Sequence, residues 1–298
     1  MTIYYLLKEG NKVYVDILIE LFPQKIEVKT DLKGIDKDND IVIIQSICFL
    51  KPVLFMKFKR IFYFNIEQMT IYTDYLQNKV DTFIPQRVIK NILNPYFKLD
   101  KEYYEKGSYK LLDYSKENVL IWKNELNHDV YGILEPYYPI QNQIPKSKKS
   151  LDYLALVNHD YRPKYIDTYL PNIKNRIRNF LGHFGKERRK ILEITKIMIN
   201  IHTGPNFRVG ELFRVNEAIA NKVIIISQNC YRNDLLSLRD YIIFCNDDEM
   251  ENKCCEVLNN YDMYYNKFFE GENLSRLENI ISDIKKNNET TISNLYVN

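Results

Sequence analysis

The chain has 298 residues, of which 45% are hydrophobic and 27% are charged. This composition is typical of a globular protein, and the length suits two domains. Its 42 basic residues against 39 acidic residues leave a formal net charge of +3, a balance that disfavours nucleic acid or a membrane surface as the partner.

The cysteines and the N-terminus indicate a cytoplasmic protein. The five cysteines form no CxxC pair and no metal-ligand spacing, which favours a reducing compartment and no bound metal: Cys48, Cys230, Cys245, Cys254 and Cys255. The first ten residues, MTIYYLLKEG, lack the basic start of a signal peptide. No apolar run is long enough to span a bilayer, so we expect no transmembrane segment.

The first half of the chain alternates apolar runs with segments of helical periodicity. Strands are predicted at residues 2–7, 25–28, 40–48, 61–66 and 130–134, and helices at residues 13–22 and 77–93. Strands that alternate with helices predict a parallel sheet covered on both faces, which is a Rossmann-like arrangement.

A polar, proline-containing stretch at residues 141–150 (QNQIPKSKKS) is the most linker-like part of the chain. We therefore expect two domains, at residues 1–145 and 146–298. The second half repeats the alternation, with strands at 151–157, 177–181, 197–201, 223–226 and 241–244, and helices at 162–170, from 186, from 212, at 247–269 and at 274–286. The polar tail from Asn287 is expected to fray.

In such sheets, ligands bind at the carboxyl ends of the strands, where loops and helix N-termini lie. This places the loop from His202 to Gly210, and the acidic start of the helix that follows it, at a candidate site. Gly204 and Asn206 lie in this loop, whose backbone N–H groups are suited to a phosphate.

The stretch from Asn200 to Gln228, NIHTGPNFRVGELFRVNEAIANKVIIISQ, resembles the donor-binding core of GT-B-type glycosyltransferases, in particular the branch found in large DNA viruses and bacteria. Short turns in the first half also match: NIEQ around Glu67, DYSKEN at 113–118 and PYYP at 136–139. The matching positions in the core are Asn200, Ile201, His202, Asn206, Glu211, Arg214, Asn216 and Glu217.

The resemblance implies an α/β fold of the GT-B type, with two Rossmann-like domains that face a central cleft and a final helix that returns to the N-terminal domain. It implies an enzyme that transfers a sugar from a nucleotide sugar to a glycan or related acceptor, without a metal or other cofactor. It further implies that the N-terminal domain binds the acceptor and the C-terminal domain binds the donor.

The resemblance also suggests roles for single residues. Glu217 would hydrogen-bond the donor ribose; alternatively, it is an exposed helix residue paired with Arg214. Glu211 would act as a catalytic group facing the donor sugar, or only as a charge at a helix N-terminus. Arg214 would serve the diphosphate, and His202 and Asn216 would contribute donor contacts.

Three further residues have two interpretations each. Glu67 is either an acceptor-side base or a carboxylate that only complements a helix dipole. Arg188 and Arg189 either clamp a diphosphate or belong to a solvated basic face, and because they lie about 100° apart on a helix we expect them to face different ways. The DYSKEN segment is predicted to form a buried polar turn that shapes the N-terminal domain.

Two positions depart from the family pattern, because Val209 and Gln228 stand where carboxylates are usual. A catalytically inactive GT-B-like protein that binds glycans or a partner transferase is therefore the main alternative. A nucleotide-dependent epimerase or dehydrogenase is disfavoured, since no GxGxxG follows the first strand. A nucleic-acid-binding role is disfavoured by the small net charge.

Overall fold

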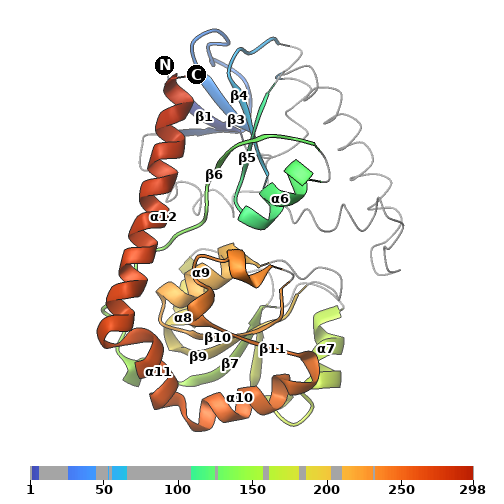
Figure 1. The fold of residues 1–298 in the computed structure, drawn as a ribbon, viewed down its shortest axis with the longest axis vertical. Coiled ribbons are helices and arrows are strands. Elements are labelled where there is room, and N and C mark those ends of the chain that lie inside the picture. Colours follow the sequence, from blue (N-terminus) through green and yellow to red (C-terminus); the bar gives the residue numbers. More distant parts are fainter. Residues whose placement is uncertain are drawn as a thin grey trace. The chain divides into compact units, whose positions relative to one another are not determined.

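The β-branched and aromatic runs form the strands of two parallel sheets, and the segments between them form helices (Figure 1). This confirms the α/β class with two Rossmann-like sheets. The computed structural model describes residues 2–6, 26–44, 53, 56–65, 109–124, 127–156, 161–180, 186–202, 210–230 and 232–297. Glu67, Gly204, Asn206 and Val209 lie outside this part of the chain, as do the predicted helices at 13–22 and 77–93, so what was expected of them stays a prediction.

The chain divides into two compact units. Unit 1 comprises Met1–Glu135 and Lys286–Asn298, and unit 2 comprises Pro136–Lys285. The boundary between units therefore precedes the linker-like stretch. That stretch packs within unit 2 because the Gln141 N–H donates to the Ala220 carbonyl at 2.8 Å.

Lys149, in the same stretch, is buried and donates to the carbonyls of Leu192 and Asn221 at 2.9 and 2.7 Å. These carbonyls lie at the carboxyl ends of two helices, where a cation is favourable. Polar composition alone therefore does not distinguish this ordered segment from a linker.

Sheet A, in unit 1, has six parallel strands in the order β2-β1-β3-β4-β5-β6. They are β1 (Ile3–Leu6), β2 (Ile26–Lys29), β3 (Ile41–Ile44), β4 (Ile61–Asn65), β5 (Lys110–Asp113) and β6 (Val130–Ile133), with helix α6 (Lys116–Asn124) between β5 and β6. The described side chains of β1, β3 and β4 are all buried, as expected of a central parallel sheet. Strand β5 and helix α6 have no separate counterpart among the elements predicted from the sequence.

The DYSKEN segment forms the predicted buried polar turn. Asp113 ends β5 with no exposed surface, and its carboxylate accepts a hydrogen bond from the Ser115 N–H at 2.9 Å and from the Asn118 amide at 3.0 Å. The Asn65 amide and the Trp122 indole donate to its other oxygen at 2.7 and 2.8 Å. One carboxylate thus joins β4, β5 and α6, which confirms the prediction.

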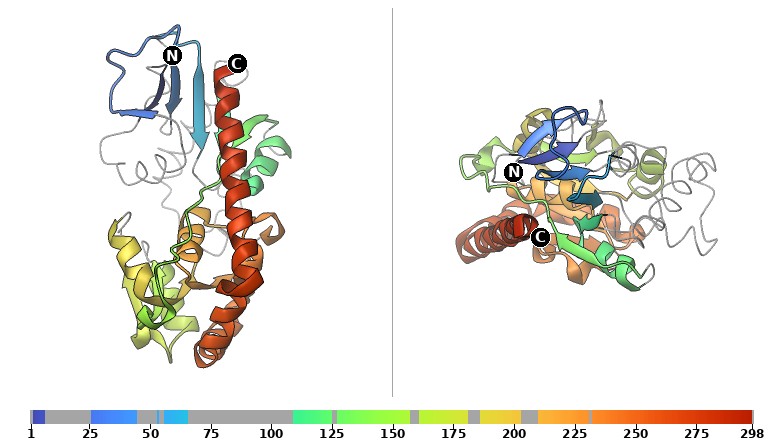
Figure 2. Two further views of the ribbon diagram at one scale, coloured as in Figure 1. Left: turned by 90° about the vertical axis from the view of Figure 1, so that its left-hand side faces the viewer. Right: turned by 90° about the horizontal axis from the view of Figure 1, so that it is seen from above.

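Helix α12 (Gly271–Val297) runs eleven residues further than the predicted helix end and does not fray from Asn287. Its last part belongs to unit 1 and lies along β6 (Figure 2). Thr291 donates to the Ile133 carbonyl at 3.3 Å, and Gly132 lacks the Cβ that would lie 2.5 Å from the Thr291 methyl group. This tertiary packing, which the polar composition does not indicate, keeps the tail helical.

Asn288 provides the most specific contact of this helix end. Its buried side-chain amide donates to the Glu135 carbonyl at 2.8 Å and accepts from the Glu135 N–H at 3.1 Å. Asn288→Ala is expected to lower the free energy of unfolding by about 2 kcal/mol, because it leaves two buried backbone groups unpaired. Urea denaturation of the full chain measures this loss.

The neighbouring Asn287 is exposed and provides a matched control. Asn287→Ala is expected to change stability by no more than about 0.5 kcal/mol. Equal effects of the two substitutions would contradict the proposed contribution of the Asn288 amide.

Sheet B, in unit 2, has five parallel strands in the order β11-β10-β9-β7-β8. The strands are β7 (Leu151–Leu156), β8 (Ile177–Phe180), β9 (Thr195–Asn200), β10 (Ile224–Gln228) and β11 (Ile242–Cys245). Helices α8 (Lys186–Ile194) and α9 (Leu212–Ala220) cover one face, and α7 (Tyr161–Tyr169), α10 (Met250–Asn259) and α11 (Tyr261–Phe269) cover the other (Figure 1). The single helix predicted at 247–269 is therefore two helices.

The strand order creates a switch point between β7 and β9. The connection from β7 leads to β8 on one side, and the connection from β9 leads to β10 on the other side. In open α/β sheets, ligands bind outside the carboxyl ends of the two strands that flank such a point. Here those ends are Leu156 and Asn200.

Candidate functional site

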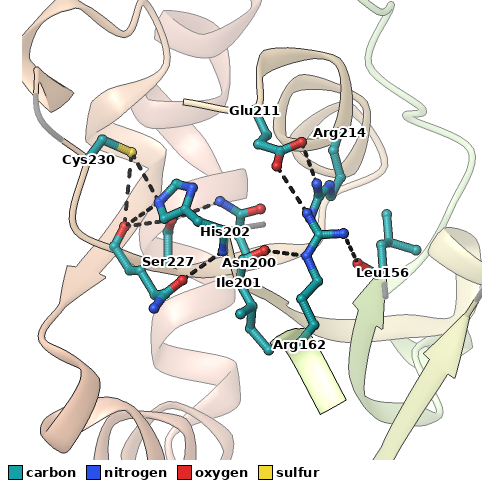
Figure 3. Close-up of polar contacts among 10 residues, drawn as sticks. Leu156, Arg162, Asn200, Ile201, His202, Glu211, Arg214, Ser227 and Cys230 are labelled. Carbon is teal, nitrogen blue, oxygen red and sulfur yellow. Dashed lines mark hydrogen bonds and ion pairs between the residues drawn. The ribbon is translucent and has the colours of Figure 1, made fainter. Parts of the chain in front are cut away.

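Arg162 occupies the switch point of sheet B. It lies in the first turn of α7 and is buried, with 3% of its surface exposed. Its Nε donates to the Ile201 carbonyl at 2.8 Å, and its Nη1 donates to the Leu156 carbonyl at 3.0 Å (Figure 3). One guanidinium therefore joins the carboxyl ends of β7 and β9.

The same guanidinium reaches the start of helix α9. Its Nη2 lies 3.1 Å from Glu211 Oε1, and Arg214, one turn along the helix, pairs with the other oxygen of Glu211. Burial alone raises the pKa of Glu211, but Arg214 and Arg162 outweigh it and hold that pKa below its ordinary value. Burial lowers the pKa of Arg162 to about 10, so at neutral pH both partners are charged.

The Arg162–Glu211–Arg214 cluster carries two positive charges against one negative charge, which leaves an excess of positive charge at the switch point. Arg214 is 9% exposed, and its Nη1 has no hydrogen-bond partner among the residues that the structure describes. A buried donor of this kind costs stability unless a ligand satisfies it. The cluster also lies at the N-terminus of α9, which favours anions.

His202 lies beside the cluster and is buried. Its backbone N–H donates to Gln228 Oε1 at 2.7 Å. Its ring Nε2 lies 3.4 Å from the Gln228 carbonyl and 3.7 Å from the Cys230 thiol (Figure 3). The fold thus brings His202, Glu211 and Arg214 together at one sheet edge.

Glu217 lies on another face of α9. It is 1% exposed and forms ion pairs with two arginines of α8. One is Arg188, and the other is Arg189, whose Nε lies 3.4 Å from Glu217 Oε1. The alternative of an exposed Glu217 paired with Arg214 is wrong, since Arg214 pairs with Glu211. As expected of adjacent helical positions, Arg188 is buried and Arg189 is partly exposed, but both long side chains reach the same carboxylate.

Asn216 is buried, and its amide donates to the Pro136 carbonyl at 2.6 Å. Within unit 2 it therefore attaches the start of the unit to α9. Its Oδ1 has no partner in the part of the chain that the structure describes. This placement separates Asn216 from the contacts of the Arg162–Glu211–Arg214 cluster.

Sequence reasoning missed Arg162 and Asp247. The available signal for Arg162 was its position in the first turn of the helix that follows β7. Asp247 follows β11 and accepts hydrogen bonds from Gln228 and Tyr165, at 2.8 and 3.1 Å. The described residues contain no group of three or more His, Cys, Asp or Glu side chains able to hold a metal ion.

Comparison with solved structures identifies the fold. The structure is similar to the crystal structure of WaaG, a glycosyltransferase involved in lipopolysaccharide biosynthesis, with a TM-score of 0.53 over 95% of this chain and 99% of that chain. This chain has the GT-B fold. The sequence identity to WaaG is 10%, so the likeness is one of fold. No family model matches the sequence.

Three similar proteins come from Acanthamoeba polyphaga mimivirus, and all are uncharacterized. R358 is 25% identical over 180 residues, covering 58% of this chain and 62% of its own length. L140 is 23% identical over 305 residues, covering 96% of this chain and 90% of its own length. L137 is 25% identical over 236 residues, covering 72% of this chain and 29% of its own length. This chain thus spans less than two thirds of R358 and of L137. No helix in the described part of the chain is both long and apolar enough to cross a membrane.

Proposed function

We propose that this protein is a metal-independent glycosyltransferase that moves a sugar from a nucleotide-sugar donor to a glycan or related acceptor. The observation that carries the proposal is the Arg162–Glu211–Arg214 cluster, which lies at the switch point of sheet B in a chain with the GT-B fold. In proteins of this architecture, this edge is where nucleotides bind.

The chemistry of the cluster suits a nucleoside diphosphate. Glycosyl transfer requires stabilisation of the charge that develops on the departing diphosphate, and preorganised guanidinium groups provide it. We propose that the Nη1 of Arg214, which has no hydrogen-bond partner among the described residues, donates a hydrogen bond to the phosphate. Glu211 is ionised and fixed between two arginines, so it is suited to accept hydrogen bonds from sugar hydroxyls rather than to touch phosphate.

We propose that Glu217 hydrogen-bonds the donor ribose and that Arg188 and Arg189 bind the diphosphate of the donor. The three side chains lie together between α8 and α9. His202 supplies a further donor contact, and Glu67, Gly204 and Asn206 keep their proposed acceptor and donor roles. We also propose a cytoplasmic location, because the scattered cysteines favour a reducing compartment.

Nucleotide-dependent thermal stabilisation tests the proposal. Wild-type protein is heated with uridine, guanosine and adenosine diphosphates and their hexose conjugates. A ligand at about one hundred times its Kd adds roughly 2.7 kcal/mol of stability. Arg214→Gln is expected to weaken binding of that ligand about tenfold or more, because it removes a charge-assisted hydrogen bond worth about 1.5–3 kcal/mol.

Arg239→Gln is the matched control, because Arg239 is half-exposed and pairs only with the neighbouring exposed Asp240 among the described contacts. It should bind nucleotides as the wild type does. The proposal fails if no nucleotide stabilises the wild type, or if Arg214→Gln binds the same nucleotide unchanged.

The inactive GT-B-like alternative is tested in the same experiment. It predicts that a nucleotide sugar binds but that no nucleoside diphosphate is released when glycan acceptors are added. Release that depends on both donor and acceptor would exclude this alternative.

A further inference from the structure

Gln228 connects the carboxyl ends of three strands of sheet B. It is the last residue of β10 and is 1% exposed. Its Oε1 accepts the His202 N–H, beyond the end of β9, at 2.7 Å, and its Nε2 donates to Asp247 Oδ1, beyond the end of β11, at 2.8 Å.

The two contacts require an amide. A glutamate at this position could accept the His202 N–H but could not donate to Asp247. It would instead place two carboxylates about 3 Å apart, an arrangement in which both do not remain ionised. The glutamine that departs from the family pattern therefore has a structural reason.

Further contacts fix both ends of this connection. Asp247 also accepts the Tyr165 hydroxyl of α7 at 3.1 Å. On the other side, Asn200 donates to the Ser227 hydroxyl at 2.9 Å, which joins the ends of β9 and β10 beneath His202 (Figure 3). A continuous polar network thus runs from α7 through Asp247 and Gln228 to His202.

We infer that Gln228 is a positioning residue, whose amide holds the backbone of His202 against Asp247 at the edge that carries the Arg162–Glu211–Arg214 cluster. His202 directly follows Ile201, whose carbonyl binds Arg162, so a shift of His202 would displace the support of the cluster. The inference rests on the proposed function only in taking this edge as the donor site.

The surroundings determine how a carboxylate at residue 228 would titrate. The titratable groups around the contact are His202 and Cys230 beside β9 and β10, Tyr165 on α7 and Cys245 on β11. Asp248 and Glu249 follow Asp247 in the chain, and Glu249 accepts the Asn246 N–H. In Gln228→Glu, the new carboxylate and Asp247 repel each other when both are ionised. This repulsion raises the pKa of one of the two carboxyl groups, which stays protonated at low pH. Both are ionised only at higher pH, so the damage should appear as pH rises.

The test is hydrogen exchange of the His202 amide, measured by NMR on the full chain without nucleotide and expressed as a protection factor. Gln228→Met removes the acceptor and should lower that factor about tenfold, the effect of one lost hydrogen bond. Gln228→Glu should resemble the wild type near pH 5 and lose about tenfold in protection at pH 8. Adding Asp247→Asn should restore protection at pH 8, because the asparagine amide can donate to the new carboxylate.

Gln143→Met, an exposed glutamine in the same unit, is the control and should leave His202 protection unchanged. The inference is overturned if Gln228→Met leaves the protection factor unchanged, or if Asp247→Asn fails to restore Gln228→Glu at pH 8. If the Gln228→Met variant does not fold, the comparison of Gln228→Glu with and without Asp247→Asn still decides the inference.

The proteins are then titrated with uridine and guanosine diphosphate. If neither nucleotide binds the wild type, the proposed function fails, while the exchange data still decide the role of Gln228.

Discussion

Asp113→Ala is expected to lower the free energy of unfolding of unit 1 by about 4 kcal/mol at pH 5. The carboxyl group is fully buried and accepts four hydrogen bonds, from Asn65, Ser115, Asn118 and Trp122. The alanine leaves all four donors without this acceptor and opens a small cavity between β4, β5 and α6. Each buried unsatisfied donor costs about 1–3 kcal/mol, and partial relaxation of the turn reduces the sum.

Trp122 makes the measurement specific to unit 1. It is the one tryptophan in the chain, it is buried, and its indole binds Asp113. Urea denaturation followed by tryptophan fluorescence therefore reports on this unit. Asp38→Ala is the control, because Asp38 is half-exposed and pairs with the exposed Lys59, and it should cost at most about 1 kcal/mol. A loss for Asp113→Ala no larger than that of the control would contradict the role of the polar turn.

The pH dependence of this unit provides a second check. Burial raises the pKa of Asp113 from 3.8 to about 7, against the four hydrogen bonds that lower it. A pKa raised by folding gives a contribution to stability that is complete below the unfolded pKa and is lost as pH rises through the folded pKa. We therefore expect the difference in stability between wild type and Asp113→Ala to narrow between pH 4 and pH 8. A difference that widens over this range would show that the hydrogen bonds outweigh burial.

Arg162→Met is expected to destabilise unit 2 by about 3–5 kcal/mol, because it removes one partner of a buried ion pair. Methionine keeps most of the side-chain length but cannot donate to the carbonyls of Leu156 and Ile201. Glu211 then keeps only Arg214, which draws that guanidinium toward the carboxylate and away from a diphosphate. Nucleotide-induced stabilisation should therefore be lost in the same variant.

Calorimetry of the full chain measures the transition of unit 2, with and without the nucleotide that stabilises the wild type. Arg176→Met is the matched control, because Arg176 is half-exposed and pairs with Asp152 at the surface. It should cost at most about 1 kcal/mol and leave nucleotide binding intact. If both variants retain nucleotide binding and similar stability, Arg162 does not hold the switch point together.

Local patterns in the sequence determined the class of the fold. Runs such as residues 41–44 (IVII) and 223–226 (VIII) are β-branched throughout and bounded by turns, which predicts buried strands whatever their partners are. The alternation of such runs with helical periodicity predicts parallel sheets, and the rule that ligands bind at carboxyl strand ends placed His202 and Glu211 at a candidate site. Arg214 was added by the resemblance. The buried turn at Asp113 was predicted from the resemblance of the DYSKEN segment to the glycosyltransferase branch, although the strand before it, β5, was not predicted.

Only the tertiary structure decided which side chains are partners. Glu211 binds Arg162, 49 residues away, and Glu217 binds arginines of α8 rather than Arg214, because the choice depends on how helices pack across the sheet. The same holds for Gln228 and Asp247, and for the end of α12, where burial of Asn288, Ile292 and Leu295 keeps a polar tail helical. Periodicity specifies the elements, but distant side chains meet only after the strand order and the helix packing are fixed.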